Sequence, residues 1–178
     1  MAPQEFDIRF ETTKGEFTAR AHRDWSPNGV DRLHELVSGG FFEDIAFFRV
    51  LDGFVAQFGI SGDPGTASEW RQKQIEDDPV KASNTEGTIS FAMAGPGTRT
   101  TQLFVNLSDN TRLDSMGFSP VAEVTEGMDV VQSLHGGYGE GAPRGNGPDQ
   151  GRIQQHGNAY LKESFPQLDY ITKAEIAG

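Results

Sequence analysis

The chain has 178 residues, and 15 Lys and Arg against 26 Asp and Glu give it a formal net charge of −11. Sequence-independent nucleic-acid binding depends on clustered basic residues, so this acidic balance argues against a nucleic-acid partner. No apolar run approaches the roughly 20 residues of a membrane span, so no membrane association is expected. The absence of cysteine excludes a disulfide framework and a cysteine-ligated zinc ion.

The length favours a single domain over residues 1–178 with a hydrophobic core of its own. The first residues contain neither the basic nor the apolar segment of a secretion signal. We therefore expect a cytoplasmic protein, or a periplasmic or organellar one if a targeting segment has been removed.

Most of the predicted elements are strands. Residues 6–10 and 17–21 alternate apolar and polar side chains on either side of Thr13-Lys14-Gly15, which predicts a hairpin with one buried face. Apolar and aromatic runs ended by Gly, Pro, Asn or Asp predict about six more strands, over residues 46–51, 54–58, 88–94, 103–107, 121–124 and 170–176.

Two helices are predicted between these strands. Ser26 supplies an N-cap and Pro27 a first helical residue for a helix that we expect to end at Gly39. A shorter helix is predicted over residues 127–135. Together with the strands, these helices predict a mainly β fold: a closed eight-stranded antiparallel β-barrel capped by two α-helices.

The sequence offers little support for metal or nucleophile chemistry. Its four histidines form no HxH or HxxxH pair, and there is no Gly-x-Ser-x-Gly elbow. The glycine-rich residues 139–145 lack the strand-to-helix context of a phosphate-binding loop. We therefore expect no metal and no cofactor. Taken alone, Arg49 would be a surface arginine beside apolar neighbours.

Three ordered segments carry a closer resemblance. Residues 47–57 read Phe-Phe-Arg-Val-Leu-Asp-Gly-Phe-Val-Ala-Gln, and residues 87–96 are followed by Thr-Gln-Leu-Phe-Val at 101–105. Leu113-Asp114 precedes the segments 121–124 and 126–131. In this order, over about residues 5–176, the chain resembles the cyclophilins, a family of peptidyl-prolyl cis-trans isomerases. Residues 137–145 and 149–153 further resemble a bacterial and plant branch with an enlarged late loop.

The resemblance implies an isomerase that accelerates rotation about X-Pro bonds in peptides and unfolded proteins without a cofactor. We also expect the protein to be a monomer. It implies that Arg49 is the catalytic residue. It also implies an apolar proline pocket and a set of residues that hold the flanking peptide. The pocket residues are Phe54, Val55, Phe104, Leu113 and Phe118, and the peptide-holding residues are Gln57, Ala92, Met93, Ala94 and Gln102.

The chain departs from the family pattern at several positions. Phe48 stands where the family often has His, Val55 where it often has Met, and Met93 where it often has Asn. Arg112 replaces a Trp that binds cyclosporin in many members, so we expect weak cyclosporin binding. The altered pocket leaves open a second hypothesis, a proline-peptide binding module or folding chaperone with little turnover. A hydrolase or a lectin on a similar barrel is a third, without positive support.

Overall fold

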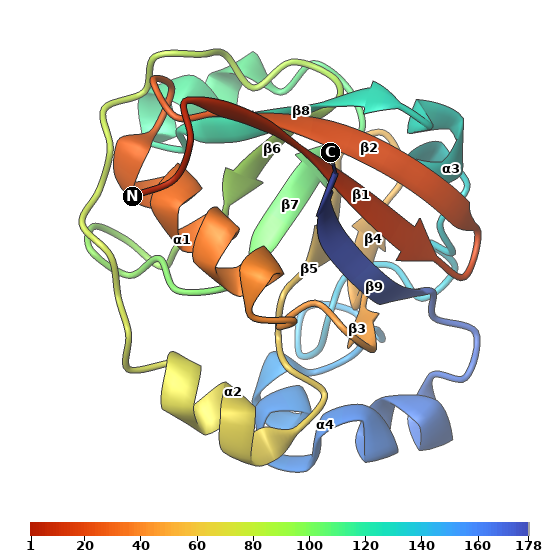
Figure 1. Cartoon of the computed structure of the whole chain (residues 1–178). Helices are drawn as coiled ribbons and strands as arrows, with labels where there is room; N and C mark the ends of the chain where they lie inside the picture. The colour runs from red at the N-terminus through yellow and green to blue at the C-terminus, as the bar shows by residue number, and fades with distance from the viewer. Residues whose placement is uncertain (178) are drawn as a thin grey trace.

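The computed structural model describes residues 1–177 and contains nine antiparallel strands in one sheet. The sheet has the order β3-β9-β1-β2-β8-β6-β7-β5-β4 and curls around the main core (Figure 1). The strands are β1 (Glu5–Thr12), β2 (Gly15–His22), β3 (Ile45–Ala46), β4 (Arg49–Leu51), β5 (Val55–Phe58), β6 (Thr88–Phe91), β7 (Leu103–Asn106), β8 (Pro120–Glu126) and β9 (Tyr170–Ala177).

The prediction of a mainly β antiparallel fold is confirmed, but a closed barrel of eight strands is not what forms. The predicted strand 46–51 is divided into β3 and β4, which pair with different partners: Ile45 lies opposite Ile171, and Arg49 lies opposite Gln57. Within residues 1–177 no ladder joins β3 to β4, so the sheet is a curled half-barrel with two short edge strands.

Four α-helices and one 3₁₀ helix accompany the sheet in the described residues, where two helices were predicted. The predicted helices are α1 (Pro27–Ser38) and the shortened α3 (Met128–Gln132). The additional elements lie outside the predicted strands and helices. They are α2 (Pro64–Trp70), the 3₁₀ helix η1 (Thr111–Met116) and α4 (Gln150–Ser164). No helix in the described part of the chain is long and apolar enough to cross a membrane.

The main core lies between the concave face of the sheet and α1. Aromatic rings fill much of it: Phe10 stacks on Phe17 with ring centroids 4.7 Å apart, and Phe42 and Phe58 pack edge-on against Phe10. The alternation of buried residues along β1 and β2 produces this face, as the sequence predicts.

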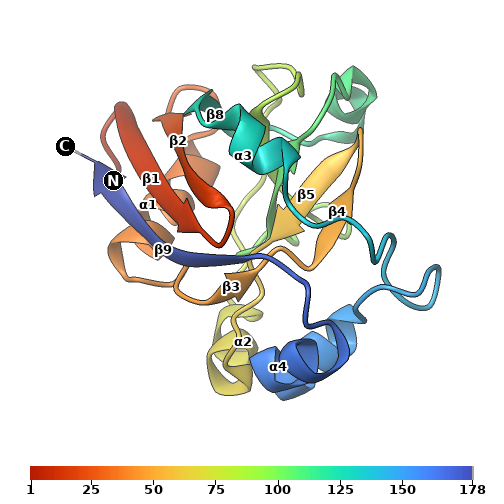
Figure 2. The same ribbon diagram turned by 90° about the vertical axis from the view of Figure 1, so that its right-hand side faces the viewer.

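A second hydrophobic cluster lies outside the main core, where α2 packs against α4 (Figures 1 and 2). Ala67 of α2 and Ile153 and Leu161 of α4 are buried there, together with Phe48. Figure 2 also shows the long segment between α3 and α4, which passes beside β4 and β5. This segment carries the late loop that reaches the candidate site.

Candidate active site

The site is built on one face of three neighbouring strands. In the β4–β5 ladder Arg49 lies opposite Gln57, and in the β5–β7 ladder Gln57 lies opposite Phe104. Side chains of directly opposed residues point to the same face of a sheet. The strand register therefore places a guanidinium, an amide and an aromatic ring side by side, although 55 positions of sequence separate the first from the last.

A hollow of about 560 Å³ opens beside these side chains. Nine of the eleven residues that we predicted for the site line it: Arg49, Phe54, Val55, Gln57, Ala92, Met93, Phe104, Leu113 and Phe118. Gln102 does not line the hollow but contacts Gln57, whose Nε2 donates to the Gln102 Oε1 at 2.9 Å. Ala94 does not line the hollow, and its N–H donates to the Thr98 Oγ1 at 2.7 Å.

Apolar side chains form the floor of the hollow. Val55, Phe104 and Leu113 are buried there in a small cluster of their own, and Phe54 and Phe118 pack against it. The rings of Phe104 and Phe118 meet edge to face, with centroids 5.6 Å apart. A pocket of this kind suits a small apolar ring.

The 3₁₀ helix η1 contributes Leu113 to this floor. The next residue of the helix, Asp114, anchors it. The Asp114 carboxylate accepts hydrogen bonds from the Ser83 hydroxyl at 2.6 Å and from the Asn84 backbone N–H at 2.8 Å. Burial acts to raise the pKa of Asp114, but these hydrogen bonds outweigh burial, so the pKa lies below its ordinary value. An ionised Asp114 therefore helps to anchor this wall of the hollow.

The guanidinium of Arg49 lies at the rim and is held on two sides. Its Nε and Nη2 donate to the two carboxylate oxygens of Glu140 at 2.7 and 2.8 Å, and its Nη1 donates to the Gln57 Oε1 at 3.0 Å. The side chain is 24% exposed, and its guanidinium carbon lies 5.9 Å from the centroid of the Phe54 ring. Arg49 is thus not a free surface arginine.

Glu140 is one of the site residues that the sequence reasoning missed, and it contacts Arg49 directly. It comes from the late loop, 91 positions after Arg49. The hydrogen bonds from Arg49 lower the pKa of Glu140 to about 2, against the opposing effect of burial, so the carboxylate is ionised at neutral pH. The resemblance of residues 137–145 to one branch marked the loop as distinctive, but nothing local in the sequence indicates its partner.

Other residues outside the prediction complete the walls. Phe48, which is 2% exposed, lines the hollow and also belongs to the second hydrophobic cluster. Met116 of η1 also lines it. The remaining contributions come from the late loop and the start of α4, namely Gly141, Ala142, Pro143, Arg144, Pro148 and Gln150.

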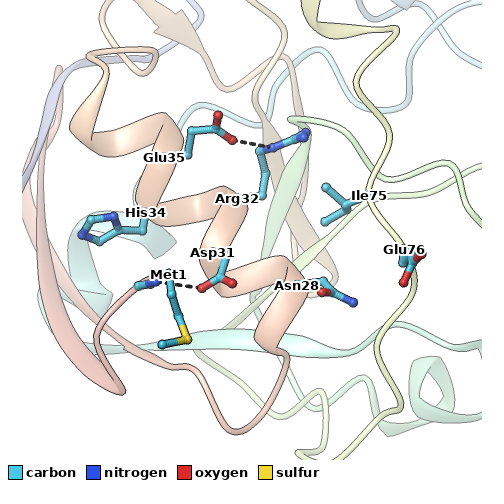
Figure 3. A pocket seen from close by; sticks show the side chains of 9 residues that line it. Met1, Asn28, Asp31, Arg32, His34, Glu35, Ile75 and Glu76 are labelled. Atoms are coloured by element: carbon cyan, nitrogen blue, oxygen red, sulfur yellow. Dashed lines mark hydrogen bonds and ion pairs between the residues drawn. The ribbon is translucent and has the colours of Figure 1, made fainter.

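Another hollow, of about 580 Å³, lies along α1 and contains none of the predicted site residues (Figure 3). Several of its charged side chains already have hydrogen-bond partners. Asp31 accepts from the Ala2 backbone N–H at 2.9 Å, and Arg32 donates to Glu35 at 3.1 Å. Over the described residues, no group of three or more His, Asp or Glu side chains could hold a metal ion.

The chain also resembles known proteins over most of its length. Residues 7–155 match the profile of the family described as cyclophilin type peptidyl-prolyl cis-trans isomerase/CLD. This match spans most of the chain, which therefore belongs to the cyclophilin-type peptidyl-prolyl cis-trans isomerases, a family of enzymes.

Individual relatives support the same assignment. The chain is 30% identical to peptidyl-prolyl cis-trans isomerase B of Escherichia coli over 138 residues, which cover 72% of this chain and 84% of the relative. It is 27% identical to peptidyl-prolyl cis-trans isomerase-like 1 of Aspergillus oryzae over 81% of this chain and 87% of the relative. Its fold is similar to that of a Cryptosporidium parvum cyclophilin type isomerase, with a TM-score of 0.70 at 17% identity, covering 98% of each chain.

Proposed function

We propose that this protein accelerates cis–trans rotation about X-Pro bonds in peptides and folding proteins, with Arg49 stabilising the twisted amide. The observation that carries the proposal is the position of the guanidinium, held at the rim of a hollow whose floor is Val55, Phe104 and Leu113. A proline ring fits the apolar floor, and the bond that precedes it then lies at the rim. The Cryptosporidium parvum relative was also crystallised in the presence of the dipeptide Ala-Pro, which supports a proline-containing substrate.

The chemistry follows from the electronic structure of the amide. Conjugation sets a rotation barrier of about 18–20 kcal/mol, although the two isomers of an X-Pro bond are close in energy. When the bond is twisted, conjugation is lost and the prolyl nitrogen regains a lone pair that neither planar isomer has. An N–H of Arg49 can donate to this lone pair, so the interaction favours the transition state over both ground states.

The surrounding polar groups hold the peptide while the bond turns. We assign Gln57 and Gln102 to the backbone flanking the proline, because Gln57 lines the hollow and hydrogen bonds link it to both Arg49 and Gln102. We assign backbone groups of Ala92 and Met93, which line the hollow, to the same role. Their hydrogen bonds would fix one side of the X-Pro bond, so that rotation is confined to the other.

Substitution of Arg49 by alanine tests the proposal. In a protease-coupled assay on a short X-Pro peptide, we expect Arg49→Ala to lower kcat/KM by about a hundredfold or more, mainly through kcat, since the lost contact forms only at the twisted bond. Arg20→Ala is the matched control, because it removes an exposed guanidinium that pairs with Asp7 on β1. Equal rates for Arg49→Ala and wild type would contradict the proposal. Peptide binding without turnover in the wild type would favour the binding-module hypothesis.

We also propose that the protein binds cyclosporin weakly. Arg112, at the position where many family members have Trp, is exposed on η1, and its guanidinium carbon lies 5.1 Å from the centroid of the Phe54 ring. A hydrated guanidinium offers less apolar contact than an indole. We expect inhibition of the isomerase assay only at micromolar or higher cyclosporin, and stronger inhibition of Arg112→Trp. Nanomolar inhibition of the wild type would contradict this.

A further inference from the structure

The late loop folds back on the backbone of Glu140. The Gly147 N–H donates to the Glu140 carbonyl at 2.8 Å, and the Gly145 N–H donates to the Gly141 carbonyl at 3.0 Å. A Cβ atom at Gly145 or Gly147 would lie only 2.3 or 2.8 Å from the Glu140 carbonyl oxygen. The close approach of these backbones requires glycine, so the composition of the loop serves the placement of Glu140.

The Glu140 carboxylate is fixed from two directions. Arg49 approaches it with Nε and Nη2 in a bidentate pair, at 2.7 and 2.8 Å. The backbone N–H of Gly141 donates to the same Oε1 at 2.9 Å. A bidentate pair with a planar guanidinium restricts both the position and the rotation of the fork, which a single hydrogen bond does not.

The guanidinium of Arg49 has more N–H groups than Glu140 and Gln57 occupy. Of the five N–H groups of Arg49, two donate to Glu140 and one donates to Gln57. Among the contacts of the described residues, one N–H on each terminal nitrogen is left over. Glu140 holds the edge formed by Nε and Nη2, while Gln57 holds Nη1, so the directions of the two remaining N–H groups are determined.

We infer that Glu140 is a positioning residue of the isomerase, which orients the guanidinium of Arg49 for the twisted X-Pro bond. The inference rests on the proposed function. A preorganised donor spends no free energy on reorientation when the lone pair appears on the prolyl nitrogen. An arginine held by Gln57 alone could rotate about that single contact, and fewer of its orientations would be productive.

A double-mutant cycle of Glu140 and Arg49 tests this inference. We expect Glu140→Ala to lower kcat about tenfold, with KM changed by less than about threefold, because substrate contacts on the floor of the hollow are kept. In an Arg49→Ala background the same change should have no further effect, since a positioning residue acts only through the group that it positions. Glu163→Ala, which removes an exposed carboxylate of α4, is the matched control for loss of charge.

Glu140→Gln keeps the shape of the side chain, so it is the control for an altered loop conformation in Glu140→Ala. We expect it to retain one hydrogen bond to Arg49 and to fall between wild type and Glu140→Ala in kcat. An unchanged or raised kcat/KM in Glu140→Ala would overturn the inference, and a raised value would show that the carboxylate competes with the substrate for Arg49. An additive loss in the Arg49→Ala background would overturn it as well. If Arg49→Ala alone matches wild type, the proposed function fails first, so the two failures are distinguishable.

Discussion

The guanidinium of Arg49 is partly buried, and hydrogen-bond acceptors hold it on two sides. Two oxygens of Glu140 and one of Gln57 accept its N–H groups, and the side chain is 24% exposed. A partly desolvated guanidinium without such partners would be costly, whereas charge-assisted hydrogen bonds offset the lost hydration. The same contacts keep the guanidinium beside the apolar hollow, which Gln57 and Glu140 also line.

The pKa of Glu140 predicts a pH dependence of stability. Pairing with Arg49 lowers it from 4.5 to about 2. A depressed folded-state pKa contributes stability that is present above the unfolded value and is lost as the pH falls toward the folded one. Because the Glu140 side chain is 35% exposed, solvent screening reduces the contribution to about 1 kcal/mol.

We therefore expect Glu140→Gln to be less stable than wild type at pH 6, with the difference shrinking between about pH 4.5 and pH 2. Urea unfolding at pH 6 and pH 3 measures the free energy of unfolding of both proteins. Glu163→Gln, on the exposed side of α4, is the matched control. A difference from wild type that is the same at both pH values would show that the pair contributes no proton-linked stability.

Individual site residues were predictable to different degrees. The signature around Arg49 places Phe54, Val55 and Gln57 beside it, and the structure brings all of them to one hollow. Glu140 could not be predicted, because the conformation of a loop 91 positions away decides where its carboxylate lies. Phe48 in place of a common His also has a structural explanation, since its side chain is shared between the hollow and the second hydrophobic cluster.

At the scale of elements, periodicity located the strands and α1 but not α4. Helix α4 has an N-cap, Asp149, whose side chain accepts from the Arg152 N–H, yet few of its residues are buried and apolar. Gly157 interrupts it with a φ of 64°, so no continuous apolar stripe marks its length. Helix α2 likewise begins with the cap Asp63 and Pro64, but its seven residues are too few to show a period.

Gly157 gives a test of how α2 and α4 are joined. A Cβ atom at this position would lie 2.0 Å from the Gly62 carbonyl oxygen, and the φ of +64° disfavours any side chain. The Asn158 N–H also donates to that carbonyl, at 2.9 Å. We expect Gly157→Ala to lower the free energy of unfolding by about 3 kcal/mol, because the backbone cannot move away without breaking this contact.

Urea unfolding measures this effect against a matched control. Gly65 is exposed in α2, and a Cβ atom there would make only an ordinary contact, 3.6 Å from the Asp63 Oδ2. Gly65→Ala should therefore leave stability unchanged or raise it by up to about 1 kcal/mol. Equal stabilities of the two variants would show that the backbone at the junction between α2 and α4 shifts to accommodate a side chain at little cost in stability.

At the scale of the whole molecule, the sequence indicates the class of fold but not how the sheet ends. Local alternation predicts each strand, whereas the partner of a strand depends on residues far away in the chain. Ile45 pairs with Ile171, and no local pattern points to that contact. The division of residues 46–51 follows from the same cause, because the two halves join opposite ends of the sheet.

The ends of the sheet have a consequence for how the molecule behaves among other chains. Long, flat outer strands can recruit foreign backbones and seed aggregates. Here the outermost strands are only two and three residues long, Ile45–Ala46 at one end and Arg49–Leu51 at the other. The two-residue β3 covers only Tyr170 and Ile171 of β9, so among the described residues the outer edge of β9 over 172–177 has no ladder partner and is the segment to which a foreign backbone could add.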